Sequence, residues 1–408
     1  MAVKIVRQAN KIALLGAPTS AAAMSPGHEG APAALRAAGL VERLQSVGYE
    51  VADLGDDPVQ CHKPDEESPR ARNLTGLIAA LEALKPRVET AVKSCALPLI
   101  LGGDCSIALA TIAGVRRYFR NVSLIYMDRD ADLNTPATTQ SGCLDGMVVS
   151  HLTGRGAAEL VRFWGEPPLV REPDLALFGV DRIDPPEAEV LQRSPLRRYL
   201  AADIQRMGAA AAAEAAIERI HGNGYEFVLH FDVDVIAGFS ATNYPAENGL
   251  RLDEVRDALE VFAKQKHLAA IEVTAYNPAK DADGCGAKTV LDLLAAVLAA
   301  RLESLRAAEA VAAVSAAQQQ AVAPETPVAT AVAAPAEPAV EPPAEPTAAV
   351  DLPPVTPGEA WSSEPLELKS ESQPAESAVE SPVSHHEDAE HAEPKLQQPS
   401  VEADKTES

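Results

Sequence analysis

The stretch VSLIYMDRDADLNTPATTQSGCLDG, residues 122–146, joins an apolar run typical of a buried strand to a series of acidic side chains. The first three acids follow the run at alternate positions, so in an extended chain their carboxylates point to one side. The stretch VLHFDVDV, residues 228–235, repeats this arrangement with two more. The five acids are Asp128, Asp130, Asp132, Asp232 and Asp234. Carboxylates gathered at strand ends repel one another without a cation, and hard oxygen ligands suit Mn²⁺ or Mg²⁺, so the sequence predicts a divalent-metal site.

Short apolar runs and amphipathic stretches alternate along the first three-quarters of the chain. The runs expected as strands are 11–18, 49–56, 97–104, 122–132, 174–184, 225–236 and 268–278. The stretches expected as helices are 31–48, 74–94, 106–119, 209–224, 250–265 and 289–305. About seven or eight such alternations predict a three-layer α/β/α fold, in which helices cover both faces of a mostly parallel sheet of roughly eight strands. A closed eight-stranded barrel is the competing topology.

Unusual polar motifs lie where the expected strands end. They are GGDCS, DRDAD, GVDRID, DVD and AYNP. In open parallel sheets ligands bind outside the carboxyl ends of the strands. The placement therefore favours one site assembled from several strand ends.

The composition changes near residue 305. Residues 311–408 hold 15 of the 32 prolines, one glycine, and 18 acidic residues against three lysines, which gives −15 of the total net charge of −24. Such a segment buries too little apolar surface to offset its chain entropy. We therefore expect a domain over residues 1–305 and a disordered, Ala/Pro/Glu-rich acidic tail over 306–408. Three tail histidines, His385, His386 and His391, belong either to solvated chain or to a stray metal site.

The cysteine pattern, the hydropathy and the net charge indicate the cellular compartment and exclude some classes of binding partner. The five cysteines are odd in number, widely spaced and free of any CxxC motif, which fits a reducing cytoplasm. The N-terminus lacks a signal-peptide core, and no run of about 18 apolar residues predicts a membrane span. The net charge of −24 argues against nucleic acid as a partner. We expect a cytoplasmic protein with neither a nucleic-acid partner nor a membrane partner.

These motifs, in order along residues 10–300, resemble those of the arginase, agmatinase and formiminoglutamase ureohydrolases. The central block MDRDADLNTPATTQSGCLDG is similar to the family's DAHTDxNTPxTTxSGNLHG, and GGDCS is similar to its GGDHS. FGVDRIDPPE, FDVDV and AYNP are similar to its GLRDxDPxE, (S/H)xDxDxxDP and ExNP. The resemblance implies two Mn²⁺ ions that share a hydroxide, which attacks a guanidinium or amidine carbon. It also implies a homo-oligomer, because family members are commonly trimers or hexamers.

The resemblance further implies a set of metal ligands in which two positions are altered. The set is Cys105, Asp128, Asp130, Asp132, Asp232 and Asp234. Cys105 and Asp130 stand where the family has histidines. A thiolate favours Zn²⁺ over Mn²⁺, so two Mn²⁺ ions are expected and Zn²⁺ or another divalent ion is the alternative. The alternative for Cys105 is a structural role, as a small buried residue at a tight turn. Arg129 either points away from the acids or turns back toward them as a counter-charge. His230 and His28 could each serve as a replacement ligand or proton carrier, and the alternative for both is a structural histidine of the core or of a loop.

Other altered positions bear on catalysis and substrate. Asp145 stands where the family has its proton-carrying histidine, and Asp145 and Asp130 are the candidate catalytic carboxylates. Ala275 replaces the glutamate that receives the guanidinium, which argues against free arginine as the substrate. The substrate contacts implied by the resemblance are Asn134, Thr139, Ser141, Asp184 and Glu187. Turn capping is the alternative role for these polar loop residues.

Two functions follow from this pattern. The first is a metal-dependent hydrolase of a C–N bond in a linear amidine or guanidino compound. The second is a non-catalytic binding or assembly protein that keeps the fold, with a structural or vacant metal site. The altered residues gather at one site and spare its aspartates, which favours the hydrolase.

Overall fold

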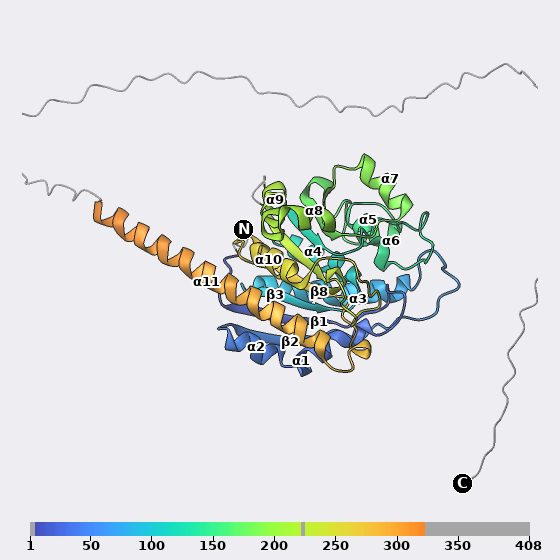
Figure 1. Cartoon of the computed structure of the whole chain (residues 1–408), viewed down its shortest axis with the longest axis horizontal. Helices are drawn as coiled ribbons and strands as arrows, with labels where there is room; N and C mark the ends of the chain where they lie inside the picture. The colour runs from blue at the N-terminus through green and yellow to red at the C-terminus, as the bar shows by residue number, and fades with distance from the viewer. Residues whose placement is uncertain (1–4, 222–224, 323–408) are drawn as a thin grey trace, which may run out of the picture. The chain divides into compact units, whose positions relative to one another are not determined.

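One parallel sheet of eight strands organises the protein (Figure 1). The computed structural model describes residues 5–221 and 225–322. The strands are β1 (Lys11–Ala17), β2 (Glu50–Asp56), β3 (Leu97–Gly102), β4 (Val122–Met127), β5 (Leu175–Val180), β6 (Arg197–Leu200), β7 (Glu226–Asp232) and β8 (Leu268–Thr274). Their order is β2-β1-β3-β8-β7-β4-β5-β6, and each neighbouring pair is parallel. The sheet is open, with β2 and β6 at its edges, so the eight-stranded parallel sheet is confirmed and the barrel alternative is wrong.

Helices cover both faces of this sheet and complete the three layers. They are α1 (Ala31–Ala37), α2 (Leu40–Ser46), α3 (Leu74–Lys93), α4 (Ala108–Arg116), α5 (Val148–Leu152), α6 (Ala158–Val161), α7 (Pro185–Arg193), α8 (Ala201–Met207), α9 (Ala209–His221), α10 (Leu252–Ala263) and α11 (Cys285–Val322). Single 3₁₀ turns lie at His28–Gly30, Cys105–Ile107, Asp145–Met147, Glu172–Asp174, Val233–Val235 and Pro278–Lys280. The buried apolar side chains form two clusters, one on each face of the sheet. The first cluster includes side chains from α1, α2, α8, α9, α10 and α11. The second includes side chains from α3, α4, α5, α6 and α7.

Strand β1 illustrates why the inner strands appear in the sequence as continuous apolar runs. Leu14 packs in one cluster and Leu15 in the other, and both are fully buried. Because successive side chains of a strand point to opposite faces, a strand covered on both faces needs an apolar residue at every position. Strands β3, β4 and β8 are buried throughout for the same reason.

Several local predictions differ from the structure, which also contains α5, α6, α7 and α8 where the sequence patterns predict no helix. The single helix expected over 31–48 is wrong, because Gly39 adopts a left-handed backbone (φ 92°) that separates α1 from α2. Strand β6 was not expected. Its sequence RRYL is short and partly exposed, so it lacks the apolar run that marks the inner strands.

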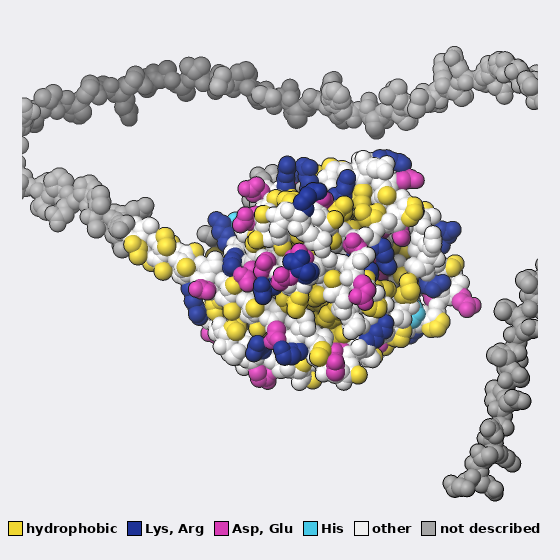
Figure 2. Space-filling model, viewed as in Figure 1, with side chains coloured by type: hydrophobic (Ala, Val, Ile, Leu, Met, Phe, Trp, Pro, Cys, Tyr) yellow, Lys and Arg dark blue, Asp and Glu magenta, His cyan; other side chains and the backbone are white. Residues whose placement is uncertain are grey.

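Helix α11 continues beyond the boundary expected at residue 305. It runs to Val322 through a proline-free, alanine-rich segment, and alanine is the best helix former. Figure 2 shows apolar side chains along the part that leaves the globular body, where Val311 and Val314 are exposed. Residues 323–408, with the three tail histidines, lie outside the described residues, so the tail stays a prediction there. No helix in the described part of the chain is long and apolar enough to cross a membrane.

The turn after β3 depends on a glycine. A Cβ atom added to Gly103 would lie 1.7 Å from the carbonyl oxygen of Thr19, so a side chain there must displace backbone. We expect Gly103→Ala to lower the free energy of unfolding by roughly 1–3 kcal/mol, as overpacking does, in urea denaturation. Gly76→Ala in α3 is the matched control, since its added Cβ would meet only ordinary contact at 3.7 Å. Equal stability of both variants would contradict the close approach at Gly103.

Candidate metal centre

Strands β4 and β7 are neighbours, and each releases an aspartate pair at its carboxyl end. The backbone N–H of Asp130 donates to Asp128 Oδ1 at 2.7 Å, and the N–H of Asp234 donates to Asp232 Oδ1 at 2.7 Å. Asp128 and Asp232 therefore each use one carboxylate oxygen to close a tight turn, and the other oxygen remains available to the site. The strand expected over 122–132 is too long, because β4 ends at Met127, but Asp128 and Asp130 still converge on one group as expected. Turns, not an extended strand, bring these carboxylates together.

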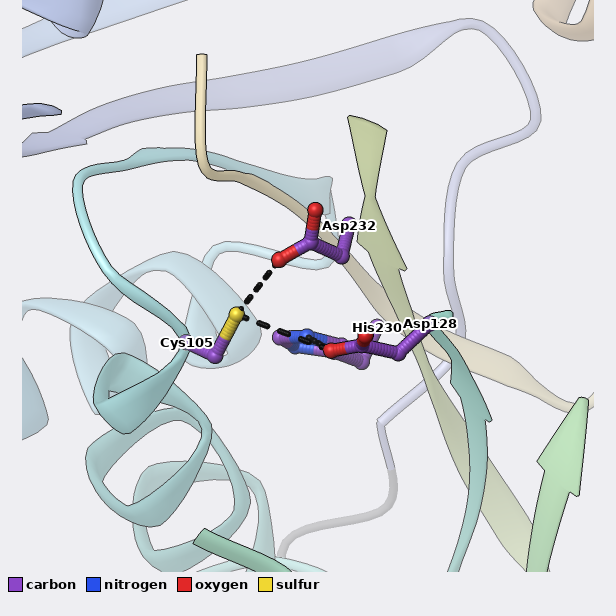
Figure 3. Close-up of side chains that lie close together, drawn as sticks. All are labelled: Cys105, Asp128, His230 and Asp232. Carbon is purple, nitrogen blue, oxygen red and sulfur yellow. Dashed lines mark hydrogen bonds and ion pairs between the residues drawn. The ribbon is translucent and has the colours of Figure 1, made fainter. Parts of the chain in front are cut away.

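Cys105 lies in the 3₁₀ turn that follows β3, and its thiol points at the aspartates. Asp104 caps this turn by accepting from the N–H of Ser106, while the N–H of Cys105 donates to Asp145 Oδ1 at 2.8 Å. The Cys105 Sγ lies 2.7 Å from Asp232 Oδ2 and 3.8 Å from Asp128 Oδ2 (Figure 3). Burial raises the pKa of the thiol well above its usual range, and the nearby Asp232 adds to the rise. The side chain is thus both a buried turn residue and a donor aimed into the acidic cluster.

His230 is part of the same cluster. It lies two residues before Asp232 on β7 and is fully buried. Its Nδ1 is 2.7 Å from Glu272 Oε1 on β8, and its ring stacks on Tyr126 at 4.2 Å between centroids. Its Nε2 lies 3.9 Å from Asp128 Oδ2. The other histidine singled out, His28, is buried away from the cluster against the Asn243 backbone, and burial lowers its pKa to about 4.

Within residues 5–221 and 225–322, potential ligand atoms form two groups that share Asp128. The first is Cys105, Asp128, His230 and Asp232, and the second is Asp128, Asp130 and Asp234. Within each group the ligand atoms all lie within 4.8 Å of one another. The first group combines sulfur, nitrogen and oxygen donors, whereas the second offers only carboxylate oxygens.

Two arginines approach the second group. Arg182 Nη2 donates to Asp130 Oδ2 at 2.6 Å. Arg129, only 7% exposed, brings its Nη2 to 3.5 Å from Asp234 Oδ2. Arg129 is therefore turned back toward the acids as a counter-charge.

The remaining acidic predictions take other positions around the same pocket. Asp132 has a left-handed backbone (φ 50°), and its carboxylate accepts from the hydroxyl of Tyr126. Asp145 accepts from the N–H of Cys105 and, at 3.3 Å, from the hydroxyl of Tyr244. Asp132 and Asp145 both line the pocket, but neither belongs to a ligand group. All members of the two ligand groups except His230 line the same pocket.

The electrostatics of this cluster suit a bound cation. Burial and mutual repulsion raise the pKa of all five aspartates, to about 7 for Asp130 and well above the usual range for Asp128, Asp132 and Asp234. One oxygen each of Asp130 and Asp234 is buried without a hydrogen-bond partner. Buried carboxylates in such a state are typically paired with a cation or coordinate a metal. The donor atoms present therefore fit a divalent ion.

The expected substrate residues are mostly occupied by local hydrogen bonds. Glu187 accepts from the N–H groups of Asp184 and Leu133, and Thr139 accepts from the N–H of Gly142. Asn134 donates to Asp184 at 3.0 Å, and Ser141 accepts from the N–H of Cys143. Of the five, Ser141 lines the pocket. Most of these hydrogen bonds cap turns. Contact with a substrate stays a prediction for Asn134, Thr139, Ser141, Asp184 and Glu187.

The sequence patterns do not predict that Met24 and Tyr244 belong to the pocket. Met24 and Tyr244 line the pocket with Arg182, and the N–H of Met24 donates to the Tyr244 hydroxyl at 3.0 Å. Tyr244 lies in the loop SATNYPAENG, which has no pattern that marks it as part of a site. Ala275, at the position of the family's guanidinium-binding glutamate, is fully buried with φ 63° and is absent from the pocket wall.

Comparison with known proteins decides the family. The sequence profile of the arginase family matches residues 10–301 of the 408. The chain belongs to the arginase family. It is 30% identical to the arginase of Brevibacillus brevis over 293 residues, which cover 71% of this chain and 98% of that one. The native arginase structure of Bacillus caldovelox superposes with a TM-score of 0.65 at 28% identity, covering 71% and 98%. The formimidoylglutamase of Bacillus subtilis, at 19% identity and a TM-score of 0.58 over 72% and 87%, shares the fold.

Proposed function

We propose that this arginase-family protein is a metal-dependent hydrolase of a C–N bond in a linear amidine or guanidino compound other than free arginine. The observation that carries the proposal is that Cys105 and the five buried aspartates that end or follow β4 and β7 converge on one pocket at the carboxyl ends of β3, β4 and β7. Membership of the arginase family supports the reaction class. The resemblance implies six donors for the ions, namely Cys105, Asp128, Asp130, Asp132, Asp232 and Asp234. All of them except Asp132 belong to one of the two ligand groups, and Asp132 could join them only through a rearrangement of the loop after β4. The resemblance implies two Mn²⁺ ions, and the thiol allows Zn²⁺ or another divalent ion.

A bound divalent ion would lower the pKa of water and supply a hydroxide near neutral pH. The chain itself must then move protons and exclude bulk water. Asp145 is held by the N–H of Cys105 and the hydroxyl of Tyr244, so its carboxyl group faces the pocket at a fixed place. We assign it the role of proton carrier, with Asp130 as the second catalytic carboxylate. Tyr244 and Met24 close the side of the pocket beside Asp145.

We propose a substrate other than free arginine because Ala275 offers no carboxylate to a guanidinium group. A buried methyl group cannot pair with a guanidinium cation, and an unpaired charge in a desolvated site is costly. Arg182, by contrast, adds a positive charge to the pocket wall. Asn134, Thr139, Ser141, Asp184 and Glu187 are proposed to form the outer part of the substrate site. A cytoplasmic location and a trimeric or hexameric assembly are further proposals from the resemblance.

A non-catalytic binding or assembly protein is the second candidate. Ala275, Cys105 and Asp130 favour it, because each replaces a residue of the family's pattern. Metal analysis of the purified full chain, followed by a screen for urea or ammonia release from guanidino and amidino compounds under Mn²⁺, Zn²⁺ or Co²⁺, separates the two. Product release supports the hydrolase, whereas absence of product from every compound under all three ions refutes it, whether or not the chain binds a metal.

Asp145 provides a test of the proton path. We expect Asp145→Asn to lower kcat by roughly 10²–10⁴-fold, the usual contribution of a general acid or base. Metal content should change little, because Asp145 belongs to neither ligand group. Asp253→Asn, on the exposed first turn of α10, is the matched control and should keep full activity. Unchanged turnover in Asp145→Asn would remove Asp145 from the mechanism.

A further inference from the structure

The first ligand group has a composition of its own. Cys105, Asp128, His230 and Asp232 come from the turn after β3, the end of β4 and strand β7, and all four are buried. Figure 3 shows their side chains directed toward one another. One sulfur, one imidazole and two carboxylates are donors that a four-coordinate zinc site uses. His230 is outside the set of ligands implied by the family motifs.

His230 is held as metal-binding histidines are held. A ligating imidazole commonly gives its other ring nitrogen to a carboxylate, which fixes the ring orientation. Here Glu272 Oε1 lies 2.7 Å from Nδ1, and Tyr126 stacks on the ring with an angle of 2° between the planes. The remaining nitrogen, Nε2, faces Asp128 at 3.9 Å and the hydroxyl of Thr274 at 3.4 Å. Glu272 and Tyr126 therefore fix the ring so that Nε2 faces the cluster.

The second group is already partly neutralised by the chain. Arg182 pairs with Asp130, and the buried Arg129 lies within 3.5 Å of Asp234. Guanidinium groups stay charged in proteins, so the two together carry the charge of one divalent ion. Each carboxylate nevertheless keeps one unpartnered oxygen, so the arginines satisfy only part of the pair. A second ion would have to enter against two fixed positive charges.

We propose that the centre binds one tightly held thiophilic divalent ion of the zinc class on Cys105, Asp128, His230 and Asp232, and that Arg129 and Arg182 replace a second ion. Binding releases the thiol proton to solvent, because the thiolate is the ligand form of cysteine. The inference rests on the same pocket as the proposed hydrolase and specifies its metal.

The metal-free full chain, loaded separately with Zn²⁺, Co²⁺ or Mn²⁺ and then desalted, tests the number and kind of ion. We expect one Zn²⁺ or Co²⁺ per chain and little retained Mn²⁺. The Co²⁺ form should show an intense near-ultraviolet thiolate-to-metal charge-transfer band. Two tightly bound ions per chain, preference for Mn²⁺, or absence of the charge-transfer band would each overturn the proposal.

Variants assign the ligands. Cys105→Ser should abolish the charge-transfer band, whereas Cys143→Ser, the other pocket cysteine, should keep it. Glu272→Gln should weaken Zn²⁺ binding by roughly 10- to 100-fold, as loss of a residue that supports a ligand does. Arg129→Met combined with Arg182→Met should raise the Co²⁺ content from one ion toward two. A charge-transfer band that persists in Cys105→Ser, or disappears equally in Cys143→Ser, would overturn the assignment.

Failure of this inference is distinguishable from failure of the proposed function, because metal counting and absorption need no substrate. One zinc-class ion without product release would support the inference and refute the hydrolase. Two Mn²⁺ ions with product release would refute the inference and support the hydrolase.

Discussion

Removal of the divalent ion with EDTA is expected to lower the thermal unfolding midpoint, and to lower it more at pH 8 than at pH 6. An ion present at about 100 to 1,000 times its Kd stabilises the native state by about 2.7–4.1 kcal/mol. At about 2–4 °C per kcal/mol, the midpoint at pH 8 should fall by roughly 5–15 °C. Scanning calorimetry of the full chain with and without EDTA measures the difference.

The pH dependence follows from the direction of the aspartate pKa shifts. Burial and repulsion raise the folded-state pKa of Asp130 from 3.8 to about 7. A carboxyl group raised in this way favours the folded state at pH values below about 4, and this contribution is lost as the pH rises through about 7. Protons thus take the place of the ion at low pH, so the metal-free protein should be more stable at pH 6 than at pH 8. An EDTA effect that is equal at both pH values, and is not reversed by returning Zn²⁺ or Mn²⁺, would contradict a carboxylate-bound ion.

The sequence predicted the parts of the fold that are encoded locally. Strands covered on both faces need unbroken apolar runs, and residues 97–102 and 122–127 show this directly. The edge strand β6 has no such run, since its sequence RRYL is partly exposed. The break between α1 and α2 depends on the backbone angle of Gly39, which composition alone does not determine.

In the site, too, the locally encoded features could be predicted from the sequence and the long-range contacts could not. The two aspartate pairs could be predicted because each follows an apolar strand within a few residues. The His230–Glu272 contact joins β7 to β8, and the Arg182–Asp130 pair joins the loops after β5 and β4. Tyr244 reaches the pocket from a long loop after β7. Such contacts depend on strand order, which no local pattern contains, so they became visible only in the structure.

Asp128 is expected to show opposite effects on function and on stability. It is the residue that both ligand groups share, and its pKa is raised by burial and then by Asp232 and Asp132. Asp128→Asn removes a ligand and should lower ion binding and turnover by at least roughly 10³-fold, since loss of a residue that only supports a ligand already costs about 10- to 100-fold. In the metal-free protein at pH 8 the same substitution removes one repelling carboxylate and should raise the unfolding midpoint. Functional sites commonly retain strain of this kind at a cost in stability.

Asp132→Asn is the comparison that makes this prediction sharp. Asp132 lines the same pocket and has a similarly raised pKa, yet it lies outside both ligand groups and is bound by the Tyr126 hydroxyl. An asparagine can still accept that hydrogen bond, so ion binding should fall by less than about 10-fold, below the cost usual for a ligand-supporting residue. Metal titration and calorimetry of the two variants side by side measure both effects. Equal loss of ion binding in both would place Asp132 among the ligands, as the family motif implies, and would show that the loop after β4 rearranges when the ion binds.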